Sequence, residues 1–199
     1  MAKELYSSGL VSHSFWFLEF KQIVLMRHEG MDYDAIKKKC IEENIFGVAK
    51  ERRARGVTGY LMTRLKALDD ALVQLFCEAD LATQKLITLV AILRSDRLYY
   101  EFLYEVYREK AILGAATLED ADVNMFFSQK EQQSELVAGW EEVTKKRLRS
   151  SYFNFLIDAG LLTVIDKKRT LTPAVLDYKL EQYLAIHDEA MLKALTGVR

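Results

Sequence analysis

The sequence has very few of the residues that interrupt a helix. It contains one proline, Pro173, and nine glycines among its 199 residues. Between these breakers, apolar residues recur at spacings of three and four over long stretches. This period, with so few breakers, is typical of helices. We therefore predict an all-α, multi-helix protein.

The sequence also lacks the patterns that most enzymes and metalloproteins need. Its two cysteines, Cys40 and Cys77, and its three histidines are scattered, and none stands at metal-ligand spacing. There is no glycine-rich phosphate loop and no nucleophile elbow. These absences predict a protein that is not an enzyme and uses no cofactor, no metal and no small-molecule substrate. Two isolated thiols are also typical of a reduced, cytoplasmic protein.

Long apolar runs are missing as well. A membrane-spanning helix needs about 20 consecutive apolar residues, and the run ITLVAIL at residues 87–93 is far shorter. The N-terminus lacks a basic region followed by an apolar core and a small-residue cleavage site. We therefore predict a cytoplasmic protein with no membrane partner.

Positive charge is not in excess, but it is unevenly distributed. The formal net charge is −1, which argues against binding of polyanions over the whole surface. Four cations nevertheless fall within residues 144–149, and residues 50–66 carry six cations against one anion, Glu51. The rest of the chain must then be net negative. Segregation of this kind favours a polyanionic partner.

The basic run opens an amphipathic helix that we expect over residues 144–159. Leu148, Tyr152 and Phe155 recur at spacings of three and four and predict a buried face, while the cations project elsewhere. Cations in the first turn oppose the helix dipole, so they need another reason, and the N-terminal half of a recognition helix in a DNA groove supplies one. The alternative is a charged helix that only faces solvent.

A small β-hairpin is expected directly after this helix. Gly160 ends the helix, and the segments LLTVI and RTLT flank a short turn with a basic tip. Helix, glycine turn and basic hairpin are the layout of a winged helix. We expect the next helix to start at Thr172 and Pro173.

The apolar period lapses near residues 128–135 and suggests a boundary. We predict an N-terminal helical domain over 1–130, with its basic segment at 50–66, and a C-terminal winged-helix-like domain over 131–199. In the first domain, leucines from Leu61 to Leu75 predict one helix over 59–77. The basic segment could alternatively pair with acidic helices elsewhere in the chain.

The predicted DNA-binding residues come from both basic segments. The expected phosphate contacts are Lys145, Lys146, Arg149, Lys167, Lys168 and Arg169, the expected base-reading residues are Arg147, Ser150, Ser151 and Asn154, and the predicted extension of the footprint is Arg52, Arg53, Arg55 and Arg64.

Four landmarks, in this order, resemble a known family. They are SSGL near the start, AKERRARGVTGYLMTRLKAL, LYYEFLYEVYREK, and TKKRLRSSYFNFLIDAGLL late in the chain. Together they resemble the BrxA family of bacteriophage-exclusion (BREX) defence systems, and the late block is the most specific part. The late motif carries over to Thr144, Lys145, Lys146, Arg147, Arg149 and Ser150, and the early one to Arg52, Arg53, Arg55 and Arg64.

The resemblance implies a cytoplasmic, non-enzymatic helical protein that binds double-stranded DNA and is encoded beside a methyltransferase and ATPases. Other subunits of the defence complex are then possible partners. Two other functions stay open: an interaction scaffold that docks on an acidic partner, and an RNA-binding protein similar to helical antitermination factors.

Overall fold

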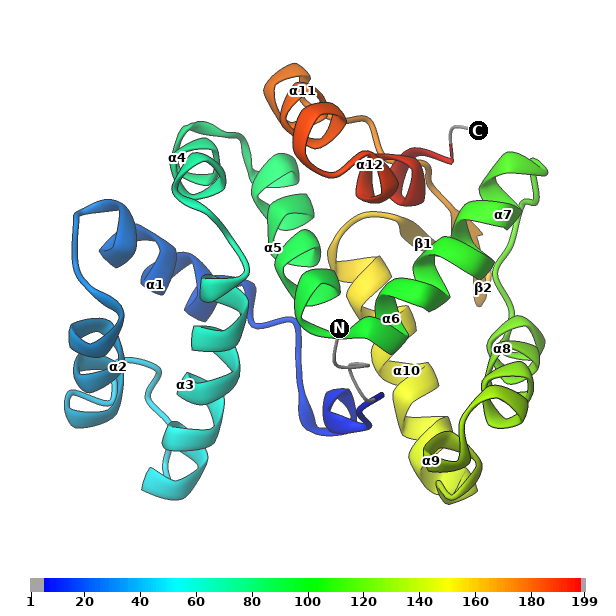
Figure 1. Cartoon of the computed structure of the whole chain (residues 1–199), viewed down its shortest axis with the longest axis horizontal. Coiled ribbons are helices and arrows are strands. Elements are labelled where there is room, and N and C mark those ends of the chain that lie inside the picture. The colour runs from blue at the N-terminus through cyan, green and yellow to red at the C-terminus, as the bar shows by residue number, and fades with distance from the viewer. Residues whose placement is uncertain (1–5, 198–199) are drawn as a thin grey trace. The chain divides into compact units, whose positions relative to one another are not determined.

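The computed structural model describes residues 6–197, which form helices joined by short loops and one two-stranded hairpin (Figure 1). The predicted helical fold with a small hairpin is confirmed. Two compact units are present. We call Phe15–Ser95 the small unit, and residues 6–14 together with 96–197 the large unit. Among the described residues, no helix is both long enough and apolar enough to cross a lipid bilayer.

The predicted domain boundary does not coincide with the division into these units. Residues 130 and 131 lie inside α8 (Asp120–Gln133) of the large unit. The ends of the two predicted domains, residues 1–5 and 198–199, lie outside the described residues.

The small unit is built from five helices that alternate with short loops. They are α1 (Phe17–His28), α2 (Tyr33–Glu42), α3 (Glu51–Lys66), α4 (Asp70–Glu78) and α5 (Leu81–Ser95). Helix α1 packs on α4, α2 packs on α3, and α3 packs on α5. Phe20, Leu61 and Phe76, from α1, α3 and α4, are fully buried, and α5 is buried on all sides from Leu86 to Leu93. Helix α5 is therefore the central helix of this unit.

The single helix predicted over 59–77 is wrong. The chain forms α3 and α4 there, because the side chain of Asp69 accepts a hydrogen bond from the Leu72 amide at 2.9 Å and begins a new helix. An aspartate at this position satisfies an amide that the first turn would otherwise leave unpaired. Leu61 and Leu72 are still both buried, so the apolar period was interpreted correctly and the break was missed.

The large unit carries the remaining elements. They are η1 (Gly9–Ser12), α6 (Arg97–Phe102), η2 (Leu103–Tyr107), α7 (Arg108–Ile112), α8 (Asp120–Gln133), α9 (Glu135–Ala138), α10 (Glu142–Asp158), β1 (Leu162–Ile165), β2 (Lys168–Leu171), α11 (Tyr178–His187) and α12 (Glu189–Thr196). Helices α6 and α7 form one continuous run, with the π-turn η2 between them. Helix α12 packs on this run.

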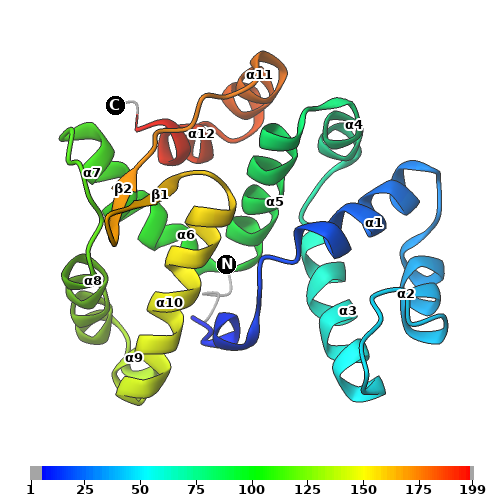
Figure 2. The same cartoon turned by 180° about the vertical axis from the view of Figure 1, so that it is seen from behind.

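An aromatic cluster fixes α10 against α6 and α8. The ring centroid of Tyr152 lies 4.6 Å from Tyr99, 5.1 Å from Phe102 and 6.0 Å from Phe127. All four rings are buried, and close tilted or stacked pairs add to the free energy gained by burial. Figure 2 shows α10 running from α9 toward β1, with α8 beside it. Helix α10 is therefore held at a fixed rotation about its axis.

The hairpin follows α10 directly and is tied to the loop before α8. Strands β1 and β2 pair antiparallel in a register that joins Leu162 to Leu171. The backbone of residues 116–118 adds a third extended segment: the Leu118 amide donates to the Arg169 carbonyl, and the Leu171 amide donates to the Ala116 carbonyl, both at 2.9 Å. The hairpin is thus fastened along the outer edge of β2.

The helix expected at Thr172 and Pro173 begins later than predicted. The Thr172 amide donates to the Leu161 carbonyl at 2.9 Å, and its hydroxyl lies 3.0 Å from that of Thr163. These bonds extend the hairpin, so Thr172 does not cap a helix. Asp177 does, since its carboxylate accepts from the Lys179 amide at 2.8 Å and α11 follows.

A candidate nucleic-acid interface

Helix α10 presents a polar, solvent-exposed stripe along one side. Lys146, Arg147, Ser150 and Asn154 are all exposed, and their spacings of one, three and four residues place them on one side of a helix. The opposite side is fixed in the aromatic cluster around Tyr152. We call these four residues the open face of α10. In the described part of the chain, neither Lys146 nor Arg147 has an acidic partner within ion-pair distance.

A second stripe of α10 turns toward α8 and is neutralised there. The Lys145 ammonium lies 2.5 Å from a Glu131 carboxylate oxygen and also pairs with Glu142. The Arg149 guanidinium lies 2.7 Å from the Asn124 amide oxygen and 3.1 Å from an Asp120 carboxylate oxygen.

We call Lys145 and Arg149 the paired face of α10. Their side chains are only 13% and 18% exposed, and the hydrogen bonds that Lys145 donates to Glu131 and Glu142 raise the pKa of Lys145. Both were predicted to contact phosphate. In the structure, these two side chains instead pair with carboxylates and an amide oxygen inside the large unit.

Arg169 belongs to the same internal network. Its guanidinium lies 2.9 Å from an Asp120 carboxylate oxygen, and its central carbon lies 3.8 Å from the ring centroid of Phe153. Asp120 therefore bridges Arg149 of α10 and Arg169 of β2 from the first turn of α8, where a negative charge is also favoured by the helix dipole. This carboxylate joins the helix to the hairpin.

The tip of the hairpin carries two solvent-exposed cations. Lys167 and Lys168 are exposed, and the described residues provide no carboxylate within ion-pair distance of either. Asp166 and Lys167 have φ angles of 48° and 64°, as the two central residues of a tight hairpin turn require. The left-handed conformation is unfavourable for lysine, so this turn holds a cation at a position where glycine would fit better.

Two of the predicted DNA-binding residues are removed from the candidate interface because they are buried. Ser151 is 9% exposed and donates to the Leu10 carbonyl at 3.0 Å, so it attaches η1 to α10. Arg64 is 2% exposed and donates to the Phe15 carbonyl at 2.7 Å. Burial lowers the pKa of Arg64 to about 10. Both residues belong to the core.

The other arginines of the early segment lie on the surface of α3 in the small unit. Arg52 and Arg53 are exposed, whereas Arg55 pairs with Glu51 one helical turn away at 2.6 Å. Such an exposed pair contributes little to stability. The basic segment at residues 50–66 and the cations of α10 and the hairpin thus belong to different compact units.

Sequence reasoning missed the acidic side of α8. Asp120, Asn124 and Glu131 lie at spacings of four and seven residues on one side of that helix and meet the paired face of α10. The signal was available, because an acidic stripe on one helix and a basic stripe on another predict that the two pack together. The high density of cations at residues 144–149 instead favoured the prediction that all of them contact DNA.

Within residues 6–197, no three histidine, cysteine, aspartate or glutamate side chains gather at a distance suited to a metal ion. Cys40 and Cys77 are free thiols.

Fold and surface define the class: a two-unit, mostly helical protein in which a fixed amphipathic helix and a tethered hairpin expose uncompensated cations. The comparisons with known proteins identify the family. The BrxA family model matches residues 4–188. A Bacillus cereus (strain H3081.97) protein named "BREX protein BrxA" is 36% identical over 199 residues, covering 99% of this chain and 100% of that one. The chain belongs to the BrxA family.

A solved structure supports the fold. The crystal structure of an uncharacterized protein from Magnetospirillum magneticum superposes with a TM-score of 0.81 and covers 97% of this chain and 99% of that chain. The two sequences are 18% identical, so the similarity concerns the fold alone.

Proposed function

We propose that this protein is a non-catalytic, double-stranded DNA-binding component of a bacterial BREX phage-defence system. Membership in the BrxA family and the name of the Bacillus cereus relative support the placement in such a system. The large unit supports the DNA-binding role, since it exposes Lys146, Arg147, Lys167 and Lys168 without acidic partners among the described residues. Other subunits of the defence complex are the proposed protein partners.

The order of elements in the large unit supports the proposal that this unit acts as a winged helix. The run α6–α7 is followed by the extended residues 116–118, then α8, α10 and the hairpin, and residues 116–118 pair with β2. In this arrangement α10 is the recognition helix and the hairpin is the wing. A recognition helix uses its N-terminal half in the major groove, and Lys146, Arg147 and Ser150 lie in that half of α10.

The residues divide into positioning and reading groups. Lys146, Lys167 and Lys168 suit phosphate, because a flexible ammonium acts as a point charge. Arg147 and Asn154 can each make two hydrogen bonds to a base edge, arginine to guanine and asparagine to adenine. Phosphate contacts fix the register and base contacts select the sequence.

One observation carries the proposal: the open face of α10 has a fixed direction. The aromatic cluster holds the buried side of the helix, and the pairs to α8 hold the paired face. The open face is therefore preorganised, and a ligand that binds it pays little ordering entropy.

The test removes the two cations of the open face together. We expect Lys146→Gln with Arg147→Gln to weaken duplex binding and to reduce the slope of log K against log[salt] by about 0.9, for the phosphate contact of Lys146. The loss of Arg147 should in addition lower the preference of the protein for one sequence over another. The matched control is Lys37→Gln with Lys38→Gln, which removes the same charge from exposed positions of α2 in the small unit. Fluorescence anisotropy over a salt series measures both. An unchanged slope in the α10 variant would reject the interface.

A competition experiment separates the alternative functions. Unlabelled duplex DNA, duplex RNA and single strands each compete with a labelled DNA duplex for binding to the protein. A pull-down of neighbouring gene products follows. We expect duplex DNA to compete best. Stronger competition by RNA would favour the antitermination-like function, and retention of an acidic partner without competition by any nucleic acid would favour the scaffold.

A further inference from the structure

The small unit contains a cavity of about 470 Å³ between α1, the loop before α3, and the start of α3. Its size lies in the range of small-molecule sites, which is roughly 300–1,000 Å³. Trp16, Phe46, Lys50, Arg53 and Glu19 are among the residues that line it. None of them belongs to α10 or the hairpin, so the cavity is independent of the proposed DNA interface.

One wall of the cavity is a rigid loop. The Asn44 side-chain oxygen accepts from the Val48 amide and its nitrogen donates to the Val48 carbonyl, both at 3.0 Å. The Gly47 amide donates to the Asn44 carbonyl at 2.8 Å. With these bonds the loop that carries Phe46 and Lys50 is formed before any ligand arrives, which lowers the entropic cost of binding.

The cavity offers positive charge to an anion. Lys50 and Arg53 are exposed and meet no carboxylate within ion-pair distance in the described part of the chain. The nearest anion along the helix, Glu51, pairs with Arg55 instead. The first turn of α3 adds its own partial positive charge, and Arg53 carries a planar fork that matches a phosphate group. Phosphate is therefore the anion that best fits Lys50, Arg53 and the first turn of α3.

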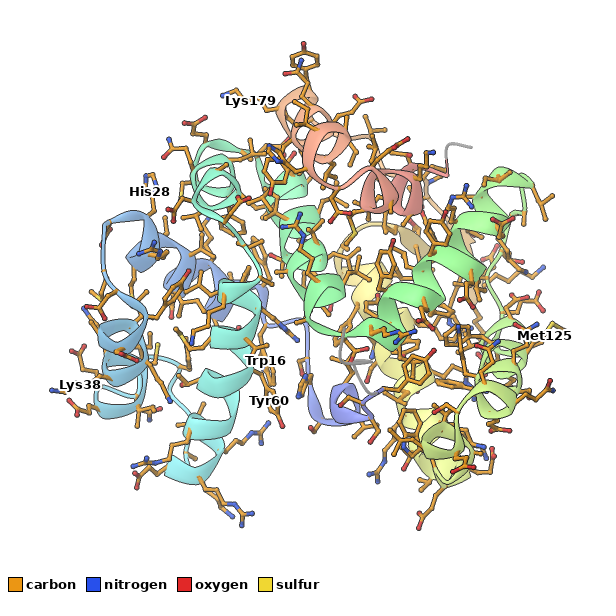
Figure 3. All side chains as sticks on the ribbon, in the orientation of Figure 1. Trp16, His28, Lys38, Tyr60, Met125 and Lys179 are labelled. Carbon is orange, nitrogen blue, oxygen red and sulfur yellow. The ribbon has the colours of Figure 1, made fainter. Side chains whose placement is uncertain are left out.

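The cavity also offers flat aromatic surface. Trp16 is held in place by the Tyr60 ring, whose centroid is 6.4 Å away at an interplanar angle of 13°, and by the Arg64 guanidinium 5.4 Å from the Trp16 ring (Figure 3). A ring supported in this way is a platform on which a base can stack. Trp16 has a φ of 50°, a left-handed conformation that a bulky side chain rarely adopts and that often marks a binding site.

A single ligand class matches the cations, the rings and the carboxylate that line the cavity. The geometry points to a nucleotide, with its phosphate at Lys50 and Arg53 and its base against Trp16 and Phe46. The Glu19 carboxylate accepts hydrogen bonds only, so it favours a base that carries an exocyclic amino group. Two sources supply this chemistry: a free nucleoside monophosphate, or the 5′-phosphorylated end of a single strand. This is a binding site, not a reaction centre.

The experiment uses the full-length protein with Trp140→Phe, which leaves Trp16 as its one tryptophan. Calorimetry and tryptophan fluorescence follow the addition of AMP, UMP, inorganic phosphate, a 5′-phosphorylated single strand and a blunt duplex. We expect AMP to bind and to quench Trp16, UMP to bind more weakly, and inorganic phosphate to bind weakest. Tighter binding of the strand identifies a strand end as the source, and tighter binding of AMP identifies the free nucleotide.

The matched pair Arg53→Gln and Arg52→Gln tests whether the phosphate binds at Arg53. Both remove one exposed charge from the same helix, but only Arg53 lines the cavity. We expect about tenfold weaker AMP binding for Arg53→Gln, because a charge-assisted hydrogen bond is lost, and unchanged binding for Arg52→Gln. Lys50→Gln provides a second variant at an exposed position.

Three results would overturn the site: no binding of AMP or of the strand at millimolar concentration, inorganic phosphate binding as tightly as AMP, or equal losses in the Arg52 and Arg53 variants. The Lys146 and Arg147 variants report on duplex binding by α10. Failure of either proposal is therefore seen separately from failure of the other.

Discussion

Two faces of α10 carry the same kinds of residue and differ in what surrounds them. Lys145 and Arg149 lie against the acidic side of α8 and are mostly enclosed. Lys146 stands one residue from Lys145, or about 100° around the helix, and Arg147 stands two residues from both Lys145 and Arg149. Lys146 and Arg147 are exposed without acidic partners among the described residues. The comparison teaches that a run of cations is divided by helix geometry: one stripe attaches the helix to its neighbour and the other is available to a ligand.

The early basic segment repeats this division within α3. Arg64 lies in the core of the small unit, whereas Arg52 and Arg53 are exposed near the N-terminal end of the same helix. In both helices some cations are enclosed by protein and others are exposed at outer positions, where our proposals assign them to ligand binding. The predictions below separate these two groups, from the largest expected effect to the smallest.

The enclosed cation with the largest expected effect is Arg64. We expect Arg64→Ala to lower the free energy of unfolding by about 3 kcal/mol, because it empties core volume and leaves the Phe15 carbonyl without this donor. Arg52→Ala, on the exposed side of α3, is the control and should stay within about 0.5 kcal/mol of the parent. Urea unfolding followed by circular dichroism measures both. Equal stabilities would show that Arg64 is not a core residue.

The bridging carboxylate Asp120 tests the paired face directly. Asp120→Asn keeps the shape but releases Arg149 and Arg169, and we expect a loss of about 1–2 kcal/mol in stability because two ion pairs and a favourable helix-dipole interaction weaken. The same change should tighten duplex binding by about threefold to tenfold at low salt, since the local field becomes more positive.

The control for Asp120→Asn is Asp34→Asn, which removes a negative charge from an exposed position of α2. Thermal unfolding measures the stability of each variant, and fluorescence anisotropy measures its affinity for duplex DNA in the same samples. If both variants tighten DNA binding equally, the effect belongs to net charge and not to the release of the two arginines.

The sequence was sufficient for the fold class and for the buried side of α10. The period of Leu148, Tyr152 and Phe155 predicted that side, and all three residues are buried. The segments LLTVI and RTLT around a turn of three residues, DKK, or the longer DKKR predicted the hairpin, and the pairing of β1 with β2 confirms it. The turn is tighter than predicted, because Ile165 pairs with Lys168. Local patterns of this kind need no knowledge of the partner surface.

The division of the cations could not be predicted from either basic segment alone. Whether Lys145 or Lys146 is neutralised depends on which side of α10 meets α8, and α8 is a separate segment of the chain. Ser151 was predicted to read bases and instead donates to Leu10, 141 residues earlier in the sequence. Contacts this distant in sequence are set by tertiary packing, which overrides local preference.

The hairpin tip offers a variant in which stability and binding change in opposite directions. Lys167 has a φ of 64°, so we expect Lys167→Gly to stabilise the protein by up to about 1 kcal/mol by relieving the left-handed strain. The same change removes a cation and should weaken duplex binding with a loss of about 0.9 in the salt slope. Lys168→Gln removes a neighbouring charge without relieving strain and is the control. Stabilisation without weaker binding would remove the tip from the interface.

The smallest expected effect comes from Lys145→Gln compared with Lys146→Gln. The two single substitutions remove the same charge from adjacent positions of one helix. For Lys145→Gln we expect a stability loss of about 0.5–1 kcal/mol, because Glu131 and Glu142 lose their partner in a partly exposed pair, and no change in the salt slope.

For Lys146→Gln we expect unchanged stability and a slope smaller by about 0.9. Anisotropy over a salt series and thermal unfolding, run on both variants, measure the contrast. A reduced slope for Lys145→Gln would mean that DNA displaces Glu131 from the ammonium. In that case the paired face opens on binding, and both stripes of α10 belong to the interface.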